Sequence, residues 1–485
     1  MSPSRRPSVT SSVVGGSIQL APAPCRHSTP RQVSPWAGDA GTAGTVGVVG
    51  AGKMGLPLAA QFADHGWNVI AVDIDERVVA SINEGRSHIG EEPGVGELVE
   101  RAHTAGRLLA TTDGAEAARA ADVVVLIVPV MLDATHRPDH GWMDAAVASI
   151  APGIHPSSLV IFETTLPVGD TRERYAPRLQ AASGLPATGD GTERINVAFS
   201  PERLYSGAAL ANLATYPKLV GGLDDASTAL AAAFYESVLD AEVVAMSSAE
   251  AAEFSKLADT TYRDVNIALA NEFARYADRI GVDITEVIDA ANSQPYSHIH
   301  QPGIGVGGHC IPVYPHFLLD RAPELSIVAR AREVNDGQVD LAVAELERVL
   351  GDLSRHAVLV LGITYRQGVK ELAYSRAIPL IAALRARGAR VLGYDPLLDD
   401  EEIERLDATP WDWGTTTPGV VALVTQTADP AWAQLDPAWF PDLRLVYDGR
   451  NSLGSFAARL GPDVAYRGVG VPERRDASDP VASRT

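Results

Sequence analysis

The chain has 485 residues, of which 46% are hydrophobic and 21% charged, and 40 basic against 61 acidic residues give a formal net charge of −21. These values are typical of a soluble globular protein of about three domains, and they exclude wholesale disorder, collagen and a coiled-coil rod. No apolar run approaches the roughly 20 residues of a membrane helix, and an acidic chain without a basic cluster is a poor partner for nucleic acid. The two cysteines, Cys25 and Cys310, cannot form a disulfide framework, so a cytoplasmic location is expected.

Both ends of the chain lack the pattern of a helix or a strand. Residues 1–43 are rich in Ser, Pro, Gly and Thr, and residues 473–485 are similarly polar, so both are expected to be disordered tails. Arg5 and Arg6 could begin a signal peptide, but the stretch that follows is too polar and too interrupted by glycine. A disordered tail or an upstream start is the simpler interpretation.

An abrupt change of pattern at Thr45 marks the first folded unit. TVGVVGAG predicts a buried parallel strand that runs into a glycine turn, LPLAAQFADHG a helix, and WNVIAVDID a second strand. Further strands are expected within residues 121–129, 157–164 and 195–200.

The same alternation recurs after residue 355. HAVLVLGIT and ARVLGYDP predict strands on either side of the helix AIPLIAALRARG, and more strands are expected at 420–425 and 443–449. We therefore predict an α/β protein with two Rossmann-like, doubly wound parallel-sheet domains joined by a long central helix and a helical domain. The expected division is a cofactor domain over 44–245, a central domain over 246–345 and a substrate domain over 346–472.

The central segment, residues 249–281, contains no proline and no internal glycine, which predicts one helix of about 50 Å. Its apolar residues recur at spacings of three and four and share one face: Ala258, Tyr262, Val265, Leu269, Phe273, Tyr276 and Ile280. Lys256, Thr260 and Arg263 lie on roughly the opposite face. The apolar face could form a dimer seam or an interdomain spine, and we favour a homodimer or a higher homo-oligomer.

The glycine turn after the first strand has the pattern G-x-G-x-x-G, from Gly50 to Gly55, and Asp73 follows 18 residues beyond Gly55. A strand before it and a helix after it are the context of a dinucleotide-binding loop, where backbone N–H groups meet the pyrophosphate. Asp73 would accept a hydrogen bond from a ribose hydroxyl and repel a 2′-phosphate, so we expect NAD rather than NADP. The positive charge of Arg77 nearby is the one feature that would favour NADP. The expected cofactor contacts are Gly50, Gly52, Lys53, Met54, Gly55, Asp73, Arg77 and Pro129.

Four glycines, at positions 303, 305, 307 and 308, precede Cys310 in QPGIGVGGHCIPV. They would let the phosphates or the sugar of a substrate lie against backbone N–H groups. An ordinary thiol is only about 3% ionised at pH 7, so a nucleophilic cysteine needs a stabilising charge. Lys256 is a candidate for that charge, although a buried structural cysteine and a solvated lysine are simpler interpretations of each residue alone.

Several motifs in one order resemble the UDP-glucose/GDP-mannose dehydrogenase family over about residues 45–470. They are GAGKMGLPLA, INEGRSHIGEEPGV, FETTLPVGDT, FSPERLYSGAAL, AEFSKLADTTYRDVNIALANE, PGIGVGGHCIPV, LGITYRQGVKELAYS and VYDGRN. The resemblance implies a four-electron oxidation of a hexose C6 alcohol to the uronate, with two NAD consumed. The aldehyde would be captured on Cys310 as a thiohemiacetal, oxidised to a thioester and released by water.

The same resemblance implies roles for individual residues. Lys256 would stabilise the oxyanion, while Glu202 and Thr165 would position water and the reacting centre around Cys310. The second sheet domain would hold the uridine diphosphate. The implied substrate contacts are Arg203, Thr260, Arg263, Gly305, Gly307, Gly308, His309, Arg366 and Arg450.

Four positions depart from the family pattern: Tyr314 for Asp, Thr260 for Asn, Val130 for Thr and Ala373 for Arg. A tyrosine with a pKa near 10 is a poor base at pH 7, so activation of the hydrolytic water would fall to Glu202, to His309 or to an unassisted water.

The GGHCIPV form, RDVNIALANE and Ser206 resemble the branch that acts on UDP-N-acetylhexosamines. We expect UDP-N-acetyl-D-mannosamine as substrate, with UDP-N-acetylglucosamine next and UDP-glucose or GDP-mannose as alternatives. A two-electron β-hydroxyacid dehydrogenase and a non-catalytic binding protein are rival hypotheses. His298 and His300 lack a third ligand, so no metal is expected.

Overall fold

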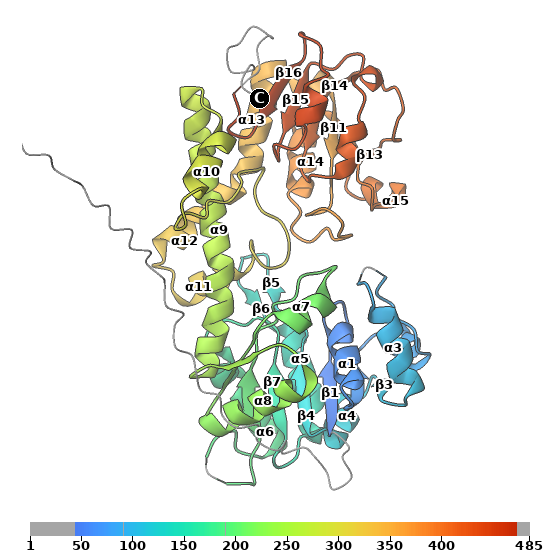
Figure 1. Ribbon diagram of the computed structural model, residues 1–485, viewed down its shortest axis with the longest axis vertical. Helices are drawn as coiled ribbons and strands as arrows, with labels where there is room; N and C mark the ends of the chain where they lie inside the picture. Colours follow the sequence, from blue (N-terminus) through green and yellow to red (C-terminus); the bar gives the residue numbers. More distant parts are fainter. Residues whose placement is uncertain (1–43, 91, 190, 473–485) are drawn as a thin grey trace, which may run out of the picture.

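The computed structural model describes residues 44–90, 92–189 and 191–472, and the two predicted tails lie outside these ranges. Two sheet domains follow one another along the long axis of the molecule, and one long helix, α9, runs beside both (Figure 1). This arrangement confirms the predicted fold class of two Rossmann-like domains with a helical region between them.

The first sheet has eight strands in the order β10-β9-β8-β7-β4-β1-β2-β3. Their bounds are β1 Thr45–Val49, β2 Asn68–Val72, β3 Leu108–Thr111, β4 Val123–Leu126, β7 Leu159–Phe162, β8 Asn196–Phe199, β9 Lys218–Gly222 and β10 Val243–Ala245. β1 lies between β2 and β4, so the chain reverses its winding direction there. This is where open α/β sheets bind nucleotides.

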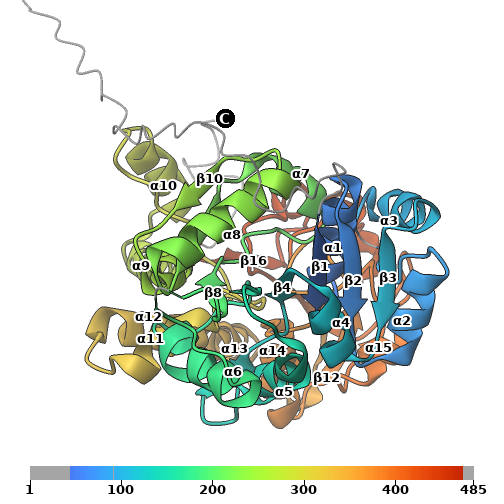
Figure 2. The same cartoon turned by 90° about the horizontal axis from the view of Figure 1, so that it is seen from below.

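Helices cover both faces of this sheet, as the view from below shows (Figure 2). They are α1 Gly55–Asp64, α2 Glu76–Asn83, α3 Val95–Thr104, α4 Gly114–Ala120, α5 Gly141–Ile150, α6 Ala176–Ser183, α7 Ala209–Thr215 and α8 Asp225–Val238. Leu56, Leu98 and Phe234 bring α1, α3 and α8 into the core of one face. Met143 and Leu179 bring α5 and α6 into the core of the other.

One strand pair departs from the predicted parallel pattern, because β8 and β9 pair antiparallel, with Ala198 opposite Gly222. The connection between them contains only the short α7. This connection does not carry the chain back to the end of the sheet where β8 begins. The chain therefore re-enters at the end where β8 finishes, and β9 must run in the reverse direction. The predicted strands of the first sheet pair in parallel, and the antiparallel pair arises from β9, a strand that was not predicted.

The second sheet has six strands, all paired in parallel, in the order β13-β12-β11-β14-β15-β16. Their bounds are β11 Ala357–Leu361, β12 Arg390–Tyr394, β13 Thr409–Pro410, β14 Val420–Thr425, β15 Leu445–Asp448 and β16 Ala465–Gly468. The associated helices are α13 Gln338–Leu350, α14 Ala377–Ala386, α15 Asp400–Glu404 and α16 Gly454–Ala457. The predicted domain limit at residue 345 falls inside α13, which packs on this sheet through Val343 and Leu346.

Helix α9 spans Ala249–Ile280, close to the predicted 249–281. Ser248 caps its first turn by accepting the N–H of Ala251, and Gly281 ends it with a φ of 72°. Its buried side carries small residues such as Ala270 and Ala274 and faces α12, Ser326–Asp336. α10 and α11 span Ile284–Asn292 and Tyr314–Arg321.

The predicted apolar stripe of α9 lies largely on the surface of this chain. Tyr262 is 52% exposed, Phe273 39% and Tyr276 54%. The stripe is therefore not the face that joins the two sheet domains.

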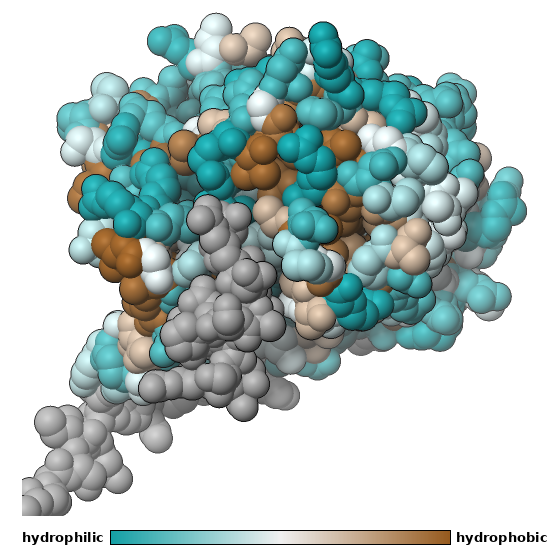
Figure 3. Space-filling model, turned by 90° about the horizontal axis from the view of Figure 1, so that it is seen from above, coloured by the Kyte–Doolittle hydropathy of each residue, from teal (hydrophilic) through white to brown (hydrophobic). Residues whose placement is uncertain are grey.

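Seen from the end that carries the second sheet, the visible surface is mostly hydrophilic with separate hydrophobic patches (Figure 3). Within the described residues, no helix is both long and apolar enough to cross a membrane.

Candidate active site

The glycine loop between β1 and α1 has the shape of a phosphate cradle. Gly50 has a φ of 96°, which an L side chain rarely adopts. A Cβ on Gly55 would lie 1.8 Å from the Gly50 carbonyl oxygen, so Gly55 permits the strand and the helix to meet. A Cβ on Gly52 would meet nothing within 4 Å. Gly52 therefore keeps open the space in front of the α1 N-terminus, and the loop fits a dinucleotide pyrophosphate.

Asp73 directly follows β2 and is tied to the same loop, since its Oδ2 accepts the N–H of Ala51 at 2.9 Å. Its carboxylate stands where a ribose hydroxyl would be bound. Arg77 is held by Asp75, with Nη2 and Oδ2 2.7 Å apart, and this pairing lowers the pKa of Asp75 to about 2. The guanidinium is thus engaged by a carboxylate, which agrees with NAD. Pro129 is exposed after β4, at the same edge of the sheet.

Cys310 lies just before α11 and is partly exposed. Its carbonyl accepts the N–H of Tyr314 at 3.0 Å, so the tyrosine opens the helix one turn later. Thr165 and Cys310 are close enough to the Tyr314 side chain to affect its pKa. Burial, and then the neighbouring Cys310, raise the pKa of Tyr314 well above 10. Tyr314 is therefore a neutral hydrogen-bonding group and not a base.

Glu202 lies near enough for its charge to raise the pKa of Tyr314. Leu204 N–H donates to its Oε1, whereas its Oε2 is buried and has no hydrogen-bond partner among the described residues. Burial raises the pKa of Glu202 to about 7, with Lys218 opposing the shift, Glu163 adding to it and Lys256 opposing it. A carboxyl with a pKa near neutrality can take a proton from water and release it again at physiological pH.

The glycines before Cys310 serve a purpose other than the predicted one. Gly303 N–H donates to Asn271 Oδ1 at 2.9 Å, Gly305 N–H to the Gly303 carbonyl at 2.8 Å, and Gly308 N–H to the Ala373 carbonyl at 3.1 Å. Three of the four N–H groups are thus bonded within the protein. The expectation that they face a substrate is wrong for these three.

The reason for these glycines is close packing against the second sheet domain. A Cβ on Gly307 would lie 2.9 Å from Tyr365 Cβ, and one on Gly308 would lie 2.8 Å from Tyr365 Cε2. A Cβ on Gly303 would lie 2.6 Å from Arg450 Nη1. The glycines therefore let the cysteine loop lie directly on Tyr365 and Arg450.

The predicted arginines fall into two groups. Arg366 joins the two sheet domains, because its guanidinium donates to the Ser206 carbonyl and lies 3.7 Å from the centre of the Tyr205 ring. Arg450 Nε donates to the Gln426 carbonyl at 2.8 Å, and burial lowers the pKa of Arg450 to about 10. Both lie beside the cysteine loop or the SPER segment. Arg203 belongs to SPER itself, is partly exposed like them and donates to the Pro217 carbonyl at 3.3 Å, whereas Arg263 is exposed.

Thr260 and His309 make contacts that the sequence did not indicate. Thr260 is buried, and its hydroxyl donates to the Lys256 carbonyl one turn earlier in α9. His309 Nε2 lies 3.3 Å from Glu371 Oε2 in the second domain. Lys53 of the glycine loop approaches the same carboxylate at 3.6 Å. Glu371 therefore connects the cofactor loop to the residue before Cys310.

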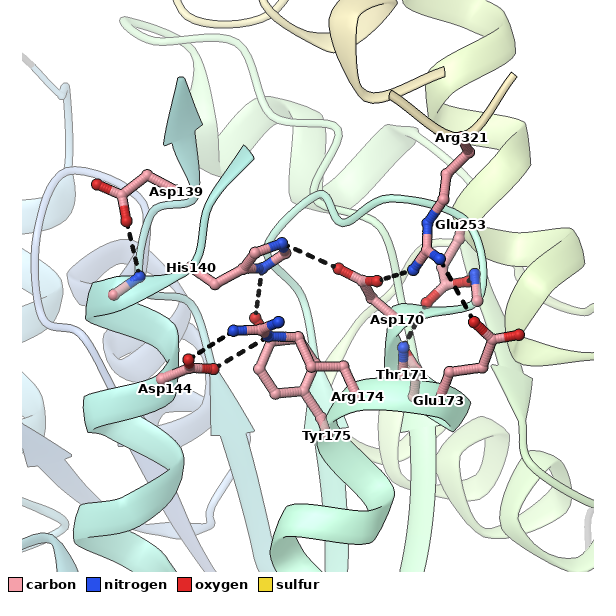
Figure 4. Close-up of polar contacts among 12 residues, drawn as sticks. Asp139, His140, Asp144, Asp170, Thr171, Glu173, Arg174, Tyr175, Glu253 and Arg321 are labelled. Atoms are coloured by element: carbon pink, nitrogen blue, oxygen red, sulfur yellow. Dashed lines mark hydrogen bonds and ion pairs between the residues drawn. The ribbon is translucent and has the colours of Figure 1, made fainter. Parts of the chain in front are cut away.

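A polar cluster fixes the segment after Thr165 against α9 and α11 (Figure 4). Glu253 of α9 accepts Gly169 N–H at 2.6 Å and both the N–H and the hydroxyl of Thr171, at 2.9 and 2.6 Å. Asp170 accepts Arg321 at the end of α11. The elements that carry Lys256, Thr165 and Tyr314 thus meet at one cluster.

Sequence reasoning did not single out Glu163, Lys218, Glu253, Tyr365, Glu371 or Gln426. Glu163 and Gln426 directly follow the buried strands β7 and β14. Polar residues at that place are typical of sites in parallel sheets, and this signal could have found them. Gln426 is fully buried, with both amide atoms unpartnered in the described part of the chain.

Comparison with protein families matches all three parts of the chain to one family. Residues 44–239 match the NAD binding domain of the UDP-glucose/GDP-mannose dehydrogenase family, residues 250–337 its central domain and residues 359–455 its UDP binding domain. The chain belongs to this family. It is an NAD-dependent nucleotide-sugar dehydrogenase, as the motifs predicted.

Individual members of the family that are similar to this chain have names that specify a substrate. The chain is 34% identical to a UDP-N-acetyl-D-mannosamine dehydrogenase of Pyrococcus horikoshii over 433 residues, 86% of this chain and 97% of the relative. It is 35% identical to an NDP-N-acetyl-D-galactosaminuronic acid dehydrogenase of Ralstonia nicotianae over 69% of this chain and 78% of the relative. A solved UDP-D-ManNAc dehydrogenase from Pyrococcus horikoshii superimposes with a TM-score of 0.77 at 30% identity, covering 88% of this chain and 99% of that one.

Proposed function

We propose that this nucleotide-sugar dehydrogenase oxidises the C6 hydroxyl of a UDP-N-acetylhexosamine to the uronate, through two intermediates bound to Cys310. UDP-N-acetyl-D-mannosamine is the substrate best supported, because the Pyrococcus horikoshii relative that aligns over most of both chains carries that name. The Ralstonia relative supports an N-acetylated hexose more generally. The overall change converts the alcohol, one water and two NAD⁺ into the carboxylate, two NADH and three protons.

NAD bound at the Gly50–Gly55 loop and Asp73 supplies the hydride acceptor for each oxidation. The first oxidation removes a hydride from C6 and the proton of its hydroxyl, leaving an aldehyde. The Cys310 sulfur then adds to the aldehyde carbon, so the carbon carries a hydrogen that can leave as the second hydride. Water attacks the resulting thioester, the carbon–sulfur bond breaks, and the thiol is restored.

The residues around Cys310 have matching tasks in this scheme. Lys256 of α9 stabilises negative charge on the C6 oxygen, and Tyr314 and Thr165 hold the neighbouring polar groups by hydrogen bonds. Glu202 takes the proton of the attacking water, because burial raises its pKa to about 7. Glu202 therefore acts as the base, which the neutral Tyr314 cannot do. We assign the uridine diphosphate to the second domain, where Arg450, Arg366 and Gln426 would contact it.

One observation carries the proposal: a partly exposed cysteine lies between the two sheets, in a loop that packs on Tyr365 of the second domain and one turn before Tyr314, which packs on the core of the first. The test measures NADH and uronate formed from a panel of UDP- and GDP-sugars. Two NADH per sugar are expected, with UDP-N-acetyl-D-mannosamine preferred. One NADH per sugar would indicate a two-electron dehydrogenase, and binding without turnover a non-catalytic protein; either result overturns the proposal.

The exposed stripe of α9 supports a homodimer or higher homo-oligomer in which copies of the chain pack through Tyr262, Leu269, Phe273 and Tyr276. Four exposed aromatic or aliphatic side chains at helical spacing on one face are more than an isolated surface helix needs. The nucleotide substrates and the small number of cysteines support a cytoplasmic location.

A further inference from the structure

A buried ion pair lies next to Glu202 and has no part in the scheme above. Lys218, the first residue of β9, has its Nζ 3.0 Å from Glu163 Oε1, and the two side chains are only 7% and 0% exposed. The Tyr235 hydroxyl of α8 donates to the same oxygen. The Lys218 ammonium also lies 4.6 Å from the centre of the Tyr235 ring.

Glu202 is connected to this pair by its backbone and by its surroundings. The Glu202 N–H donates to the Glu163 carbonyl at 3.0 Å, so the two carboxylates are fixed on neighbouring strand ends. Lys218 and Glu202 line the same small cavity. In the described part of the chain, Glu202 Oε2 and Glu163 Oε2 are both buried without a hydrogen-bond partner.

Two buried carboxylates at such close quarters destabilise each other unless a positive charge lies beside them. The Nζ of Lys218 binds only one oxygen of Glu163 directly. Its remaining charge acts on Glu202, and it lowers the pKa of Glu202 more than any other residue does. Lys256 is a second cation near Glu202, but its effect is smaller.

We propose that Lys218 is a positioning residue for the hydrolysis step: its buried charge keeps Glu202 ionised and oriented toward the acyl group on Cys310, and Glu163 limits how much of that charge Glu202 receives. This inference rests on the proposed function, because it concerns the base that releases the uronate. Lys218 touches neither the substrate nor Cys310, and it acts only through Glu202.

The charges that face Glu202 give the proposal a sign. Lys218 from β9 and Lys256 from α9 lower the pKa of Glu202, while Glu163 after β7 raises it. Tyr235 of α8 and Tyr314 of α11 stay neutral, since burial raises the pKa of each. Lys218→Met therefore raises the pKa of Glu202. Glu163→Gln lowers it, because the substitution removes a neighbouring negative charge and frees the Lys218 ammonium from its partner carboxylate.

The experiment follows decay of the acyl-enzyme from pH 5.5 to 9. The full-length protein is mixed with NAD and UDP-N-acetyl-D-mannosamine, quenched at intervals, and the acylated fraction is measured by intact-protein mass. The rate rises with pH through the pKa of Glu202. In Lys218→Met we expect the midpoint of the pH–rate curve to move up by at least one pH unit, which makes release about tenfold slower at pH 6. In Glu163→Gln we expect the midpoint to move down. Lys218→Arg keeps the wild-type midpoint, and the double variant Lys218→Met/Glu163→Gln returns close to it.

Opposite shifts from the two neutralising substitutions separate electrostatic control from structural damage, which slows release without moving the midpoint in two directions. Equal shifts, or none, overturn the inference. If Lys218→Met does not fold, Glu163→Gln and Lys218→Arg decide, and an unchanged midpoint in Glu163→Gln overturns it. A wild-type protein that forms no acyl-enzyme refutes the proposed function instead, so the two failures are distinguishable.

Discussion

Gly52 and Gly55 belong to one loop, but the structure predicts opposite consequences for the same substitution to alanine. A Cβ on Gly55 would stand 1.8 Å from the Gly50 carbonyl oxygen and 3.0 Å from Ile127 Cγ2. Relief of that overlap requires the strand and the helix to separate, which we expect to cost at least about 3 kcal/mol. For a domain of about 200 residues, this lowers Tm by about 6–12 °C.

Gly52→Ala should leave the fold intact. The new methyl group meets no atom within 4 Å, and the φ of Gly52 is not positive, so the expected change in stability is within about 0.5 kcal/mol. The same methyl group occupies the space that the pyrophosphate needs. We therefore expect NAD to bind at least about tenfold more weakly, a loss of about 1.4 kcal/mol.

The two effects are measured separately, by thermal unfolding without ligand and by calorimetric titration with NAD. Each variant serves as the control for the other, because they differ only in which side of the loop receives the methyl group. Wild-type NAD affinity in Gly52→Ala would show that the loop is not the cofactor cradle. An equal loss of stability in both variants would refute the packing argument.

Four further outcomes follow from the structure. Cys310→Ser should keep the fold and lose about a thousandfold or more of steady-state uronate production, measured by NADH release; retained turnover would exclude covalent catalysis. Because burial raises the pKa of Glu202 from 4.5 to about 7, the folded state binds that proton more tightly than the unfolded state, and the wild type loses stability as pH rises through this window. Glu202→Gln should therefore gain more in Tm over the wild type at pH 8 than at pH 5, and an equal difference at both pH values would contradict the assigned burial. Phe273→Asp should shift the mass in light scattering toward the monomer without changing the circular dichroism spectrum, and an unchanged mass would place the seam elsewhere. Glu253→Gln should lower both Tm and kcat, because an amide cannot accept three donors, whereas Glu250→Gln, which only weakens a half-exposed ion pair with Arg172, should change Tm by under about 2 °C; equal effects would show that the Glu253 cluster does not position the site.

Strong local patterns made the main elements predictable. The absence of proline and internal glycine fixed α9 nearly to the residue, and continuous Val, Leu and Ile runs marked β1, β4, β11 and β14. β9 was missed because KLVGG contains two glycines and is too short for a clear period. Its reversed direction was unpredictable, because strand direction depends on where the preceding connection crosses the sheet.

The candidate site divides in the same way. A G-x-G-x-x-G loop between a strand and a helix has one common use, so the cofactor residues could be derived from their context. The gathering of Glu202, Thr165 and Cys310 came only from resemblance, because they lie on separate segments. The glycines before Cys310 led to a wrong expectation. A position with no room for a Cβ looks the same in the sequence whether its close neighbour is a ligand or a side chain such as Tyr365. Lys218 carries no local signal at all: its importance comes from Glu163, which lies 55 positions earlier in the chain.

The close seating of Gly307 and Gly308 on Tyr365 has a consequence for timing. It presses the loop before Cys310 onto the sheet that we assign to the nucleotide, while Val313 and Phe317 just after it lie in the core of the sheet that receives the dinucleotide. A hinge motion that parts the two sheets would therefore pull on the short segment that carries the sulfur. Exchange of spent NADH between the two oxidations, when the sugar is held as a thiohemiacetal, would then have to proceed while the sheets stay together, and hydrolysis would follow only after the second oxidation forms the thioester.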